Sequence, residues 1–225
     1  MKKIMKNFSS IQTLIFDLDG TLYQFPEGSY RASRLRERIS LNAKKYLQEK
    51  FGFSLEQAQK CFDELSQKYG EELSIGFEKE YHLDRYQYFS IVWNISASEF
   101  IQYDPEIKTI LQKFKERFQC ILLSDAPEVW VSHVLEALEI KEIFSGKIFS
   151  GEGDQRKSFG NAFKKILSIY NLKPEECLAI GDQEETDILP AKALGMKTIF
   201  IHSTKTSKYA DFSVHSLKEA LNLFE

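Results

Sequence analysis

The stretch "LIFDLDGTLY", residues 14–23, ends an apolar run with two aspartates separated by a single leucine. Asp17 and Asp19 are followed directly by Gly20 and Thr21. Two carboxylates this close repel each other, and burying either of them costs free energy. Either the chain turns into solvent here, since Asp and Gly both suit tight turns, or a cation and a reaction require both acids.

Composition limits the function classes open to this 225-residue chain. Hydrophobic residues make up 43% and charged residues 28%, which is typical of a folded globular protein. The net charge of −3 argues against a nucleic-acid polymer or a membrane surface as partner, because both attract proteins with a basic excess. The sequence contains no run of 18 apolar residues, and its basic start is not followed by a signal-peptide apolar region, so we expect no membrane span.

The three cysteines are Cys61, Cys120 and Cys177. They are odd in number, far apart and never arranged as a CxxC pair. We therefore expect buried free thiols in a reducing compartment, and a cytoplasmic protein. The sequence says nothing about the oligomeric state.

Short apolar strands alternate with amphipathic helices over most of the chain. After a first strand at 11–16, the pattern resumes beyond residue 104 with strands expected at 119–124, 146–151, 177–182 and 197–202. Helices of about ten residues or more between such strands imply crossover connections and a parallel sheet. We therefore expect an α/β fold: a Rossmann-like parallel sheet with helices on both faces.

Residues 24–103 differ in character, because only helical patterns are found there. One helical face, for example, carries Leu35, Ile39, Ala43 and Tyr46. We expect two domains, a Rossmann-like core made of residues 1–23 and 104–225 and an all-helical domain inserted between them.

Three expected strands end on polar residues, in "LIFDLD", "CILLSD" and "CLAIGD". In open parallel sheets the ligand crevice lies outside the carboxyl ends of the strands, so these ends would meet at one site. They would supply Asp17, Asp19, Ser124 and Asp182, with Asp125 and Asp187 nearby. Several hard oxygen ligands around one point suit Mg²⁺, which would also compensate the clustered negative charge.

Such a site could cleave a phosphate ester. A carboxylate can attack phosphorus and form an acyl phosphate, while a second acid protonates the leaving alcohol and later activates water. The phosphate oxygens would need donors, for which Ser124 and the backbone amides after Asp17 are candidates. Lys157 is the best-placed lysine, because it opens the helix expected after the third strand.

These residues resemble the four ordered motifs of the haloacid dehalogenase superfamily. The matching segments are "DLDGT" at 17–21, "LLS" ending at Ser124, Lys157, and "GDQEETD" at 181–187. The helical insertion resembles the α-helical cap of that superfamily. The resemblance implies a Mg²⁺-dependent phosphatase that acts on a small phosphate monoester through an aspartyl-phosphate intermediate.

The resemblance also implies a role for each motif residue. Asp17 would be the nucleophile and a Mg²⁺ ligand, and Asp19 the general acid/base, with its backbone carbonyl on the metal. Ser124 and Lys157 would hold the phosphoryl group, and Asp182 would complete the protein ligands to Mg²⁺. Because family dehalogenases lack an aspartate at the position of Asp19, its presence favours phosphate chemistry over carbon–halogen cleavage.

Three further residues would lie beside these groups: Asp187, which would orient a water molecule or Lys157, together with Thr21 and Asp125. Two departures from the family pattern leave open questions. Lys157 is followed by serine where relatives often have proline, so Lys147 is the alternative motif lysine. Asp125 adds a carboxylate after the motif serine, which would weaken anion binding unless it turns away or is paired.

The substrate is less well determined than the reaction. The stretch at 86–111, "YQYFSIVWNISASEFIQYDPEIKTIL", together with Tyr23, resembles the pyrimidine 5′-nucleotidase branch of the superfamily, which implies a nucleoside 5′-monophosphate. The alternatives are a sugar-phosphate or phosphoglycolate phosphatase, and a phosphomutase. A different class is a non-catalytic binding or regulatory protein that uses the same fold.

Overall fold

The computed structural model describes residues 8–70, 72–152, 156–157 and 160–225. Its centre is a six-stranded sheet in the order β3-β2-β1-β4-β5-β6, in which every pair of neighbours is parallel. The strands are β1 Thr13–Phe16, β2 Gln119–Leu123, β3 Ile148–Phe149, β4 Cys177–Gly181, β5 Lys197–Ile201 and β6 Phe212–Val214. The parallel sheet predicted from the alternating pattern is confirmed.

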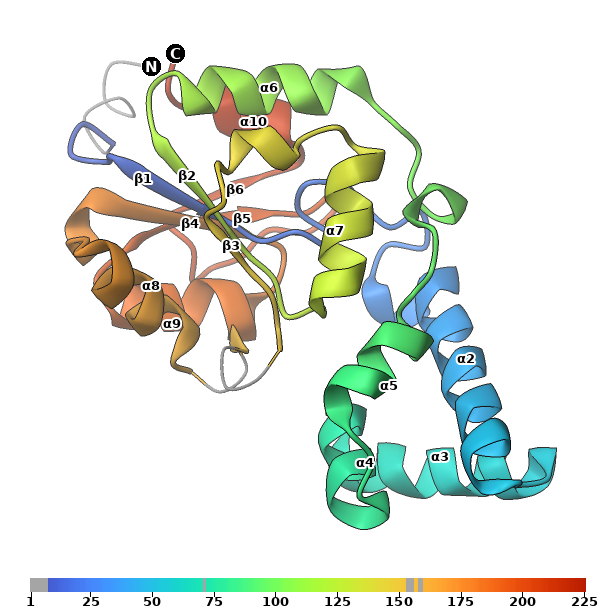
Figure 1. The fold of residues 1–225 in the computed structure, drawn as a ribbon. Helices are drawn as coiled ribbons and strands as arrows, with labels where there is room; N and C mark the ends of the chain where they lie inside the picture. Colours follow the sequence, from blue (N-terminus) through green and yellow to red (C-terminus); the bar gives the residue numbers. More distant parts are fainter. Residues whose placement is uncertain (1–7, 71, 153–155, 158–159) are drawn as a thin grey trace.

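Helices cover both faces of this sheet (Figure 1). They are α6 Pro105–Lys115, α7 Glu128–Ala137, α8 Ala162–Tyr170, α9 Leu189–Ala193 and α10 Leu217–Asn222, with single turns at η3 Lys141–Ile143 and η6 Pro174–Glu176. Side chains of a strand alternate between faces, so Phe16 of β1 packs on Phe114 of α6 while Ile15 joins Phe163 of α8 on the other side. The predicted α/β core with helices on both faces is confirmed.

The chain between β1 and α6 forms four longer helices, which we call the inserted helices. They are α2 Arg34–Phe51, α3 Leu55–Tyr69, α4 Leu73–Tyr81 and α5 Arg85–Val92, flanked by the single turns η1 Tyr30–Ala32 and η2 Ala97–Glu99. Figure 1 shows them grouped to one side of the sheet. On α2 the residues at helical spacing, Leu35, Ile39, Ala43 and Tyr46, are all buried.

Two expected helices begin differently from the prediction. The helix expected to open at Lys157 starts at Ala162, after Gly160 takes a positive φ of 73° that interrupts any helix. The helix expected between the strands at 177–182 and 197–202 is divided into a π-helical turn, η7 Glu184–Ile188, and α9. Pro190 lacks the N–H that would bond to the carbonyl four residues earlier, and the chain takes the wider turn before it.

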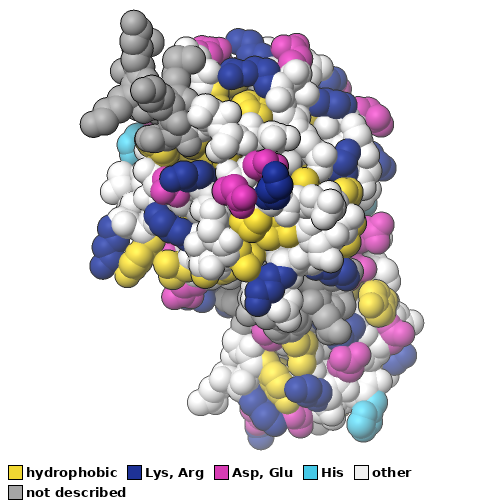
Figure 2. Space-filling view, turned by 90° about the vertical axis from the view of Figure 1, so that its left-hand side faces the viewer, with side chains coloured by type: hydrophobic (Ala, Val, Ile, Leu, Met, Phe, Trp, Pro, Cys, Tyr) yellow, Lys and Arg dark blue, Asp and Glu magenta, His cyan; other side chains and the backbone are white. Residues whose placement is uncertain are grey.

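The surface mixes charges of both signs, as Lys, Arg, Asp and Glu side chains are interspersed on the face shown in Figure 2. No helix within the described ranges is long and apolar enough to cross a membrane. All three cysteines belong to the described part of the chain, and each is a buried free thiol, as predicted.

Candidate active site

The predicted convergence of strand ends is present. Asp17, Ser124 and Asp182 directly follow β1, β2 and β4, and these three strands are neighbours in the sheet. Carboxylate oxygens of Asp17, Asp182 and Asp187 all lie within 4.8 Å of one another, and we call these three residues the acidic cluster. The chain therefore concentrates negative charge at the carboxyl edge of the sheet.

The acidic cluster fits a hard divalent cation such as Mg²⁺. Asp17 and Asp187 are buried, and Oδ1 of Asp182 is buried with no hydrogen-bond partner in the part of the chain that the structure describes. Burial, and then the charge of Asp17, raise the pKa of Asp182 well above its ordinary value. A cation that takes oxygen ligands would both satisfy this atom and compensate the repulsion.

Two glycines allow the acids to approach so closely. Gly20 has a φ of +92°, and a Cβ built on it would lie 2.3 Å from Oδ2 of Asp182. A Cβ on Gly181 would lie 2.3 Å from the side-chain Cγ of Asp187. The glycines next to the aspartates in "DLDG" and "GD" are thus part of the geometry of the acidic cluster.

Lys157 lies inside the acidic cluster and is itself buried. Its Nζ is 2.5 Å from Oδ1 of Asp17 and 2.6 Å from Oδ1 of Asp187. Burial works against its charge, but the carboxylates of Asp17, Asp187 and Asp125 outweigh burial and raise the pKa of Lys157 well above its ordinary value. Lys157 therefore stays charged and offsets part of the negative charge around it.

Asp125 and Lys147, the residues of the two departures from the family pattern, lie in different surroundings. Asp125 is paired, because its Oδ1 accepts a hydrogen bond of 2.5 Å from the backbone N–H of Lys157. It thereby fixes the loop that carries the lysine. Lys147, the alternative, precedes β3 and so lies at the amino end of that strand, away from the edge where the acids meet.

Thr21 and Asp187 complete the contacts around Asp17 and Lys157. The hydroxyl of Thr21 donates a 2.8 Å hydrogen bond to Oδ2 of Asp17. Oδ2 of Asp187 accepts one of 3.0 Å from the backbone N–H of Gln183, at the start of the π-helical turn. Burial raises the pKa of Asp187 to about 7, although Lys157 acts in the opposite direction.

Asp19 faces a different set of partners. Its Oδ1 accepts hydrogen bonds from the indole Nε1 of Trp130, at 2.7 Å, and from the hydroxyl of Tyr23. Burial raises the pKa of Asp19 to about 6, against the lowering effect of these two hydrogen bonds. Sequence reasoning missed Trp130, which is 111 residues away and carries no motif signal.

Ser124 follows β2 directly and lies beside Asp19. Its Oγ accepts a 3.0 Å hydrogen bond from the backbone N–H of Ala126 and faces Oδ2 of Asp19 at 3.4 Å. The hydroxyl is thus held at the end of β2, next to Asp19.

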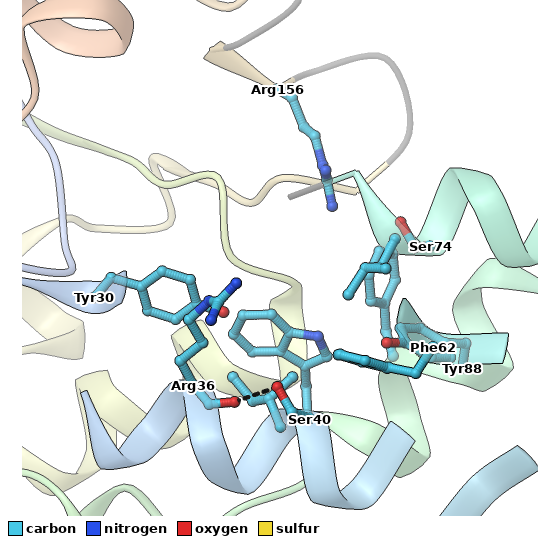
Figure 3. A pocket seen from close by; sticks show the side chains of 11 residues that line it. Tyr30, Arg36, Ser40, Phe62, Ser74, Tyr88 and Arg156 are labelled. Atoms are coloured by element: carbon cyan, nitrogen blue, oxygen red, sulfur yellow. Dashed lines mark hydrogen bonds between the residues drawn. The ribbon is translucent and has the colours of Figure 1, made fainter. Parts of the chain in front are cut away.

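A cavity of about 40 Å³ lies where the inserted helices meet the loop before Lys157 (Figure 3). Its lining combines aromatic and polar side chains: Tyr30, Arg36, Ser40, Phe62, Ser74, Tyr88, Trp93 and Arg156. Figure 3 shows Arg156 pointing from the loop toward the inserted helices, and it forms an ion pair with Glu72. No motif pointed to Arg156 beforehand, although it directly precedes Lys157.

Comparison with known proteins finds relatives that are named phosphatases and a solved structure with the same fold. The glyceraldehyde 3-phosphate phosphatase of Pyrococcus furiosus is 30% identical over 125 residues, so the match spans 52% of this chain and 52% of that one. The enzyme of the same name from Methanocaldococcus jannaschii is 26% identical over 226 residues, 95% of this chain and 96% of that one. A crystal structure of a haloacid dehalogenase phosphatase from Thermococcus onnurineus has the same fold, with a TM-score of 0.69 at 18% identity over 95% of this chain and 97% of that one.

The family itself follows from a match over most of the chain. The family model for haloacid dehalogenase-like hydrolases matches residues 11–195, from β1 to the end of α9. This range includes every residue of the acidic cluster together with Asp19, Ser124 and Lys157. The chain belongs to the haloacid dehalogenase-like hydrolases.

Proposed function

We propose that this chain is a Mg²⁺-dependent phosphatase that hydrolyses a small phosphate monoester through an aspartyl phosphate on Asp17. The observation that carries the proposal is the contact of one buried carboxylate, Asp17, with two further acids and a charged lysine at the edge of a parallel sheet. The phosphatase names of the curated relatives support the same reaction class.

In this proposal Asp17 is the nucleophile and Asp19 is the general acid and base. The carboxylate of Asp17 attacks phosphorus and forms the acyl phosphate as the ester P–O bond breaks. Asp19 donates its proton to the leaving oxygen and then takes a proton from the water that hydrolyses the acyl phosphate. The phosphoryl oxygens are held by the hydroxyl of Ser124 and by Lys157, whose Nζ also lies 2.5 Å from Oδ1 of Asp17.

The cation would be held by the side chains of Asp17 and Asp182 and by the backbone carbonyl of Asp19. When bound, it supplies positive charge that offsets the repulsion between the acids and the incoming phosphate. Asp187 contacts Lys157 directly, at 2.6 Å, and we assign it the role of orienting that lysine.

For the substrate, we propose a small sugar-phosphate-like monoester rather than a nucleotide. The two glyceraldehyde 3-phosphate phosphatases described above act, by their name, on a three-carbon phosphate. Residues 24–103 would serve as a cap that closes over the core of residues 1–23 and 104–225, excluding water and contacting the leaving group.

One observation favours the nucleoside monophosphate as a second candidate. The rings of Tyr30 and Trp93 line the cavity and are stacked, with centroids 6.4 Å apart and an interplanar angle of 11°. Aromatic faces of this kind can stack on a base.

The test is phosphate release from a panel of monoesters in the presence of Mg²⁺. We expect turnover of glyceraldehyde 3-phosphate and other sugar phosphates well above that of UMP, CMP and 2-phosphoglycolate. A preference for UMP or CMP would replace the sugar phosphate with the second candidate. Conversion of a phosphate ester to its isomer without release of free phosphate would point to a phosphomutase.

Binding of Mg²⁺ is expected to stabilise the protein, and the Asp182→Asn variant to lose that effect. At a Mg²⁺ concentration of 100 times Kd, binding to the folded state adds about 2.7 kcal/mol to the free energy of unfolding and raises Tm by several degrees. The measurement is the Mg²⁺-induced change in Tm, with Asp63→Asn, an exposed acid on α3, as the matched control. An equal shift in Asp182→Asn and wild type would contradict the assignment of this ligand.

A further inference from the structure

The two oxygens of the Asp19 carboxylate are not equivalent. Oδ1 accepts both the 2.7 Å hydrogen bond from Trp130 and the one from Tyr23, while Oδ2 has the more distant Ser124 hydroxyl at 3.4 Å. An indole N–H can only donate. Two donors occupy both lone pairs of Oδ1, so a proton on the Asp19 carboxyl group is accommodated on Oδ2.

Packing fixes both donors. Trp130 is fully buried on α7, and its ring meets the edge of Phe100 with centroids 6.4 Å apart. Tyr23 is also buried, and its ring meets the edge of Phe25 at 5.4 Å. Side chains held in this way keep one rotamer, so the direction of their hydrogen bonds is set before any substrate arrives.

We propose that Trp130 and Tyr23 are positioning residues that anchor Oδ1 of Asp19 and turn Oδ2 toward Ser124, and that Oδ2 carries the proton transferred in the reaction. This inference rests on the proposed phosphatase function. Ser124 is the residue assigned to the phosphate, so the oxygen facing it is the one directed toward the ester.

In both steps of the reaction the proton is exchanged at the same atom, Oδ2 of Asp19. As the bond between phosphorus and the leaving oxygen breaks, the proton on Oδ2 moves to that oxygen and Asp19 becomes a carboxylate. Water then attacks phosphorus of the acyl phosphate, its proton returns to Oδ2, and the carboxylate of Asp17 is released. Trp130 and Tyr23 keep their own protons throughout and act only through Asp19.

The experiment compares two substrates that differ in their need for the acid. The alcohol of a sugar phosphate must be protonated as it leaves, whereas 4-nitrophenyl phosphate releases a stable phenolate. We expect Trp130→Phe and Tyr23→Phe each to lower kcat/KM for the sugar phosphate by about tenfold or more, and for 4-nitrophenyl phosphate by less than about twofold. The quantity kcat/KM is chosen because it reports on the steps up to departure of the leaving group.

A double-mutant comparison separates positioning from a structural effect. In the Asp19→Asn background, Trp130→Phe is expected to change kcat/KM for the sugar phosphate by less than about twofold, because the residue it acts through is already disabled. Tyr46→Phe is the control: it removes the hydroxyl that donates to Gln87 on the inserted helices, and activity on both substrates should be unaffected. Thermal melts identify any variant that has lost its fold. Because Trp130 and Tyr23 are tested separately, the proposal can still be judged if one of the two variants fails to fold.

The outcomes separate the positioning role of Trp130 and Tyr23 from the phosphatase function. Equal losses on both substrates, or the same loss of activity in the Asp19→Asn background, would overturn the positioning role and leave the phosphatase function standing. Absence of phosphate release by the wild-type protein from every monoester would overturn the phosphatase function and the positioning role with it.

Discussion

Asp17→Asn is expected to lower kcat/KM for the preferred phosphate monoester by more than about 10⁴-fold. An amide oxygen is a far weaker nucleophile than a carboxylate, and the variant would also lose one ligand of the proposed cation. The side chain keeps nearly the same size, so contacts at the end of β1 are preserved. The measurement is steady-state release of phosphate with Mg²⁺ present.

Two controls make this loss interpretable. Asp63→Asn, the same substitution at an exposed position of α3, should retain wild-type activity. A cooperative thermal melt of Asp17→Asn would show that the fold survives. Residual turnover within about tenfold of wild type would mean that another residue, or water directly, attacks phosphorus.

The second large effect concerns stability, because Lys157→Met is expected to lower the free energy of unfolding by about 3–5 kcal/mol. Methionine fills a similar volume but leaves Asp17 and Asp187 buried without the cation that lies 2.5 and 2.6 Å from them. The nearby Asp182 adds to the repulsion, because its carboxylate interacts unfavourably with those of Asp17 and Asp187. Urea unfolding in the presence of a chelator measures the effect without compensation by a divalent cation.

The matched control is Lys164→Met, a lysine exposed on α8, for which a change within about 0.5 kcal/mol is expected. If Lys157→Met were as stable as this control, the buried lysine would contribute no net stabilisation to the acidic cluster.

Most of the acidic cluster could be predicted from the sequence, for a simple physical reason. An apolar run that ends in an acid indicates both a buried strand and the position of its carboxyl end. Parallel strands bring their carboxyl ends to the same edge of the sheet. Asp17 and Asp182 follow from this rule, and Asp187 lies one turn further along. The helix expected at Lys157 was wrong in its start, because the loop continues through Gly160 with a positive φ before α8 begins.

The sequence by itself therefore determined the parallel sheet and the residues at its carboxyl edge, since hydrophobic alternation and strand-end motifs are local along the chain. Only the tertiary structure decided which partners those residues have. Trp130 reaches Asp19 from 111 residues away, and Arg156 meets Glu72 across 84. Contacts of this kind depend on how helices pack against the sheet and on each other, and no periodic pattern in the chain encodes them.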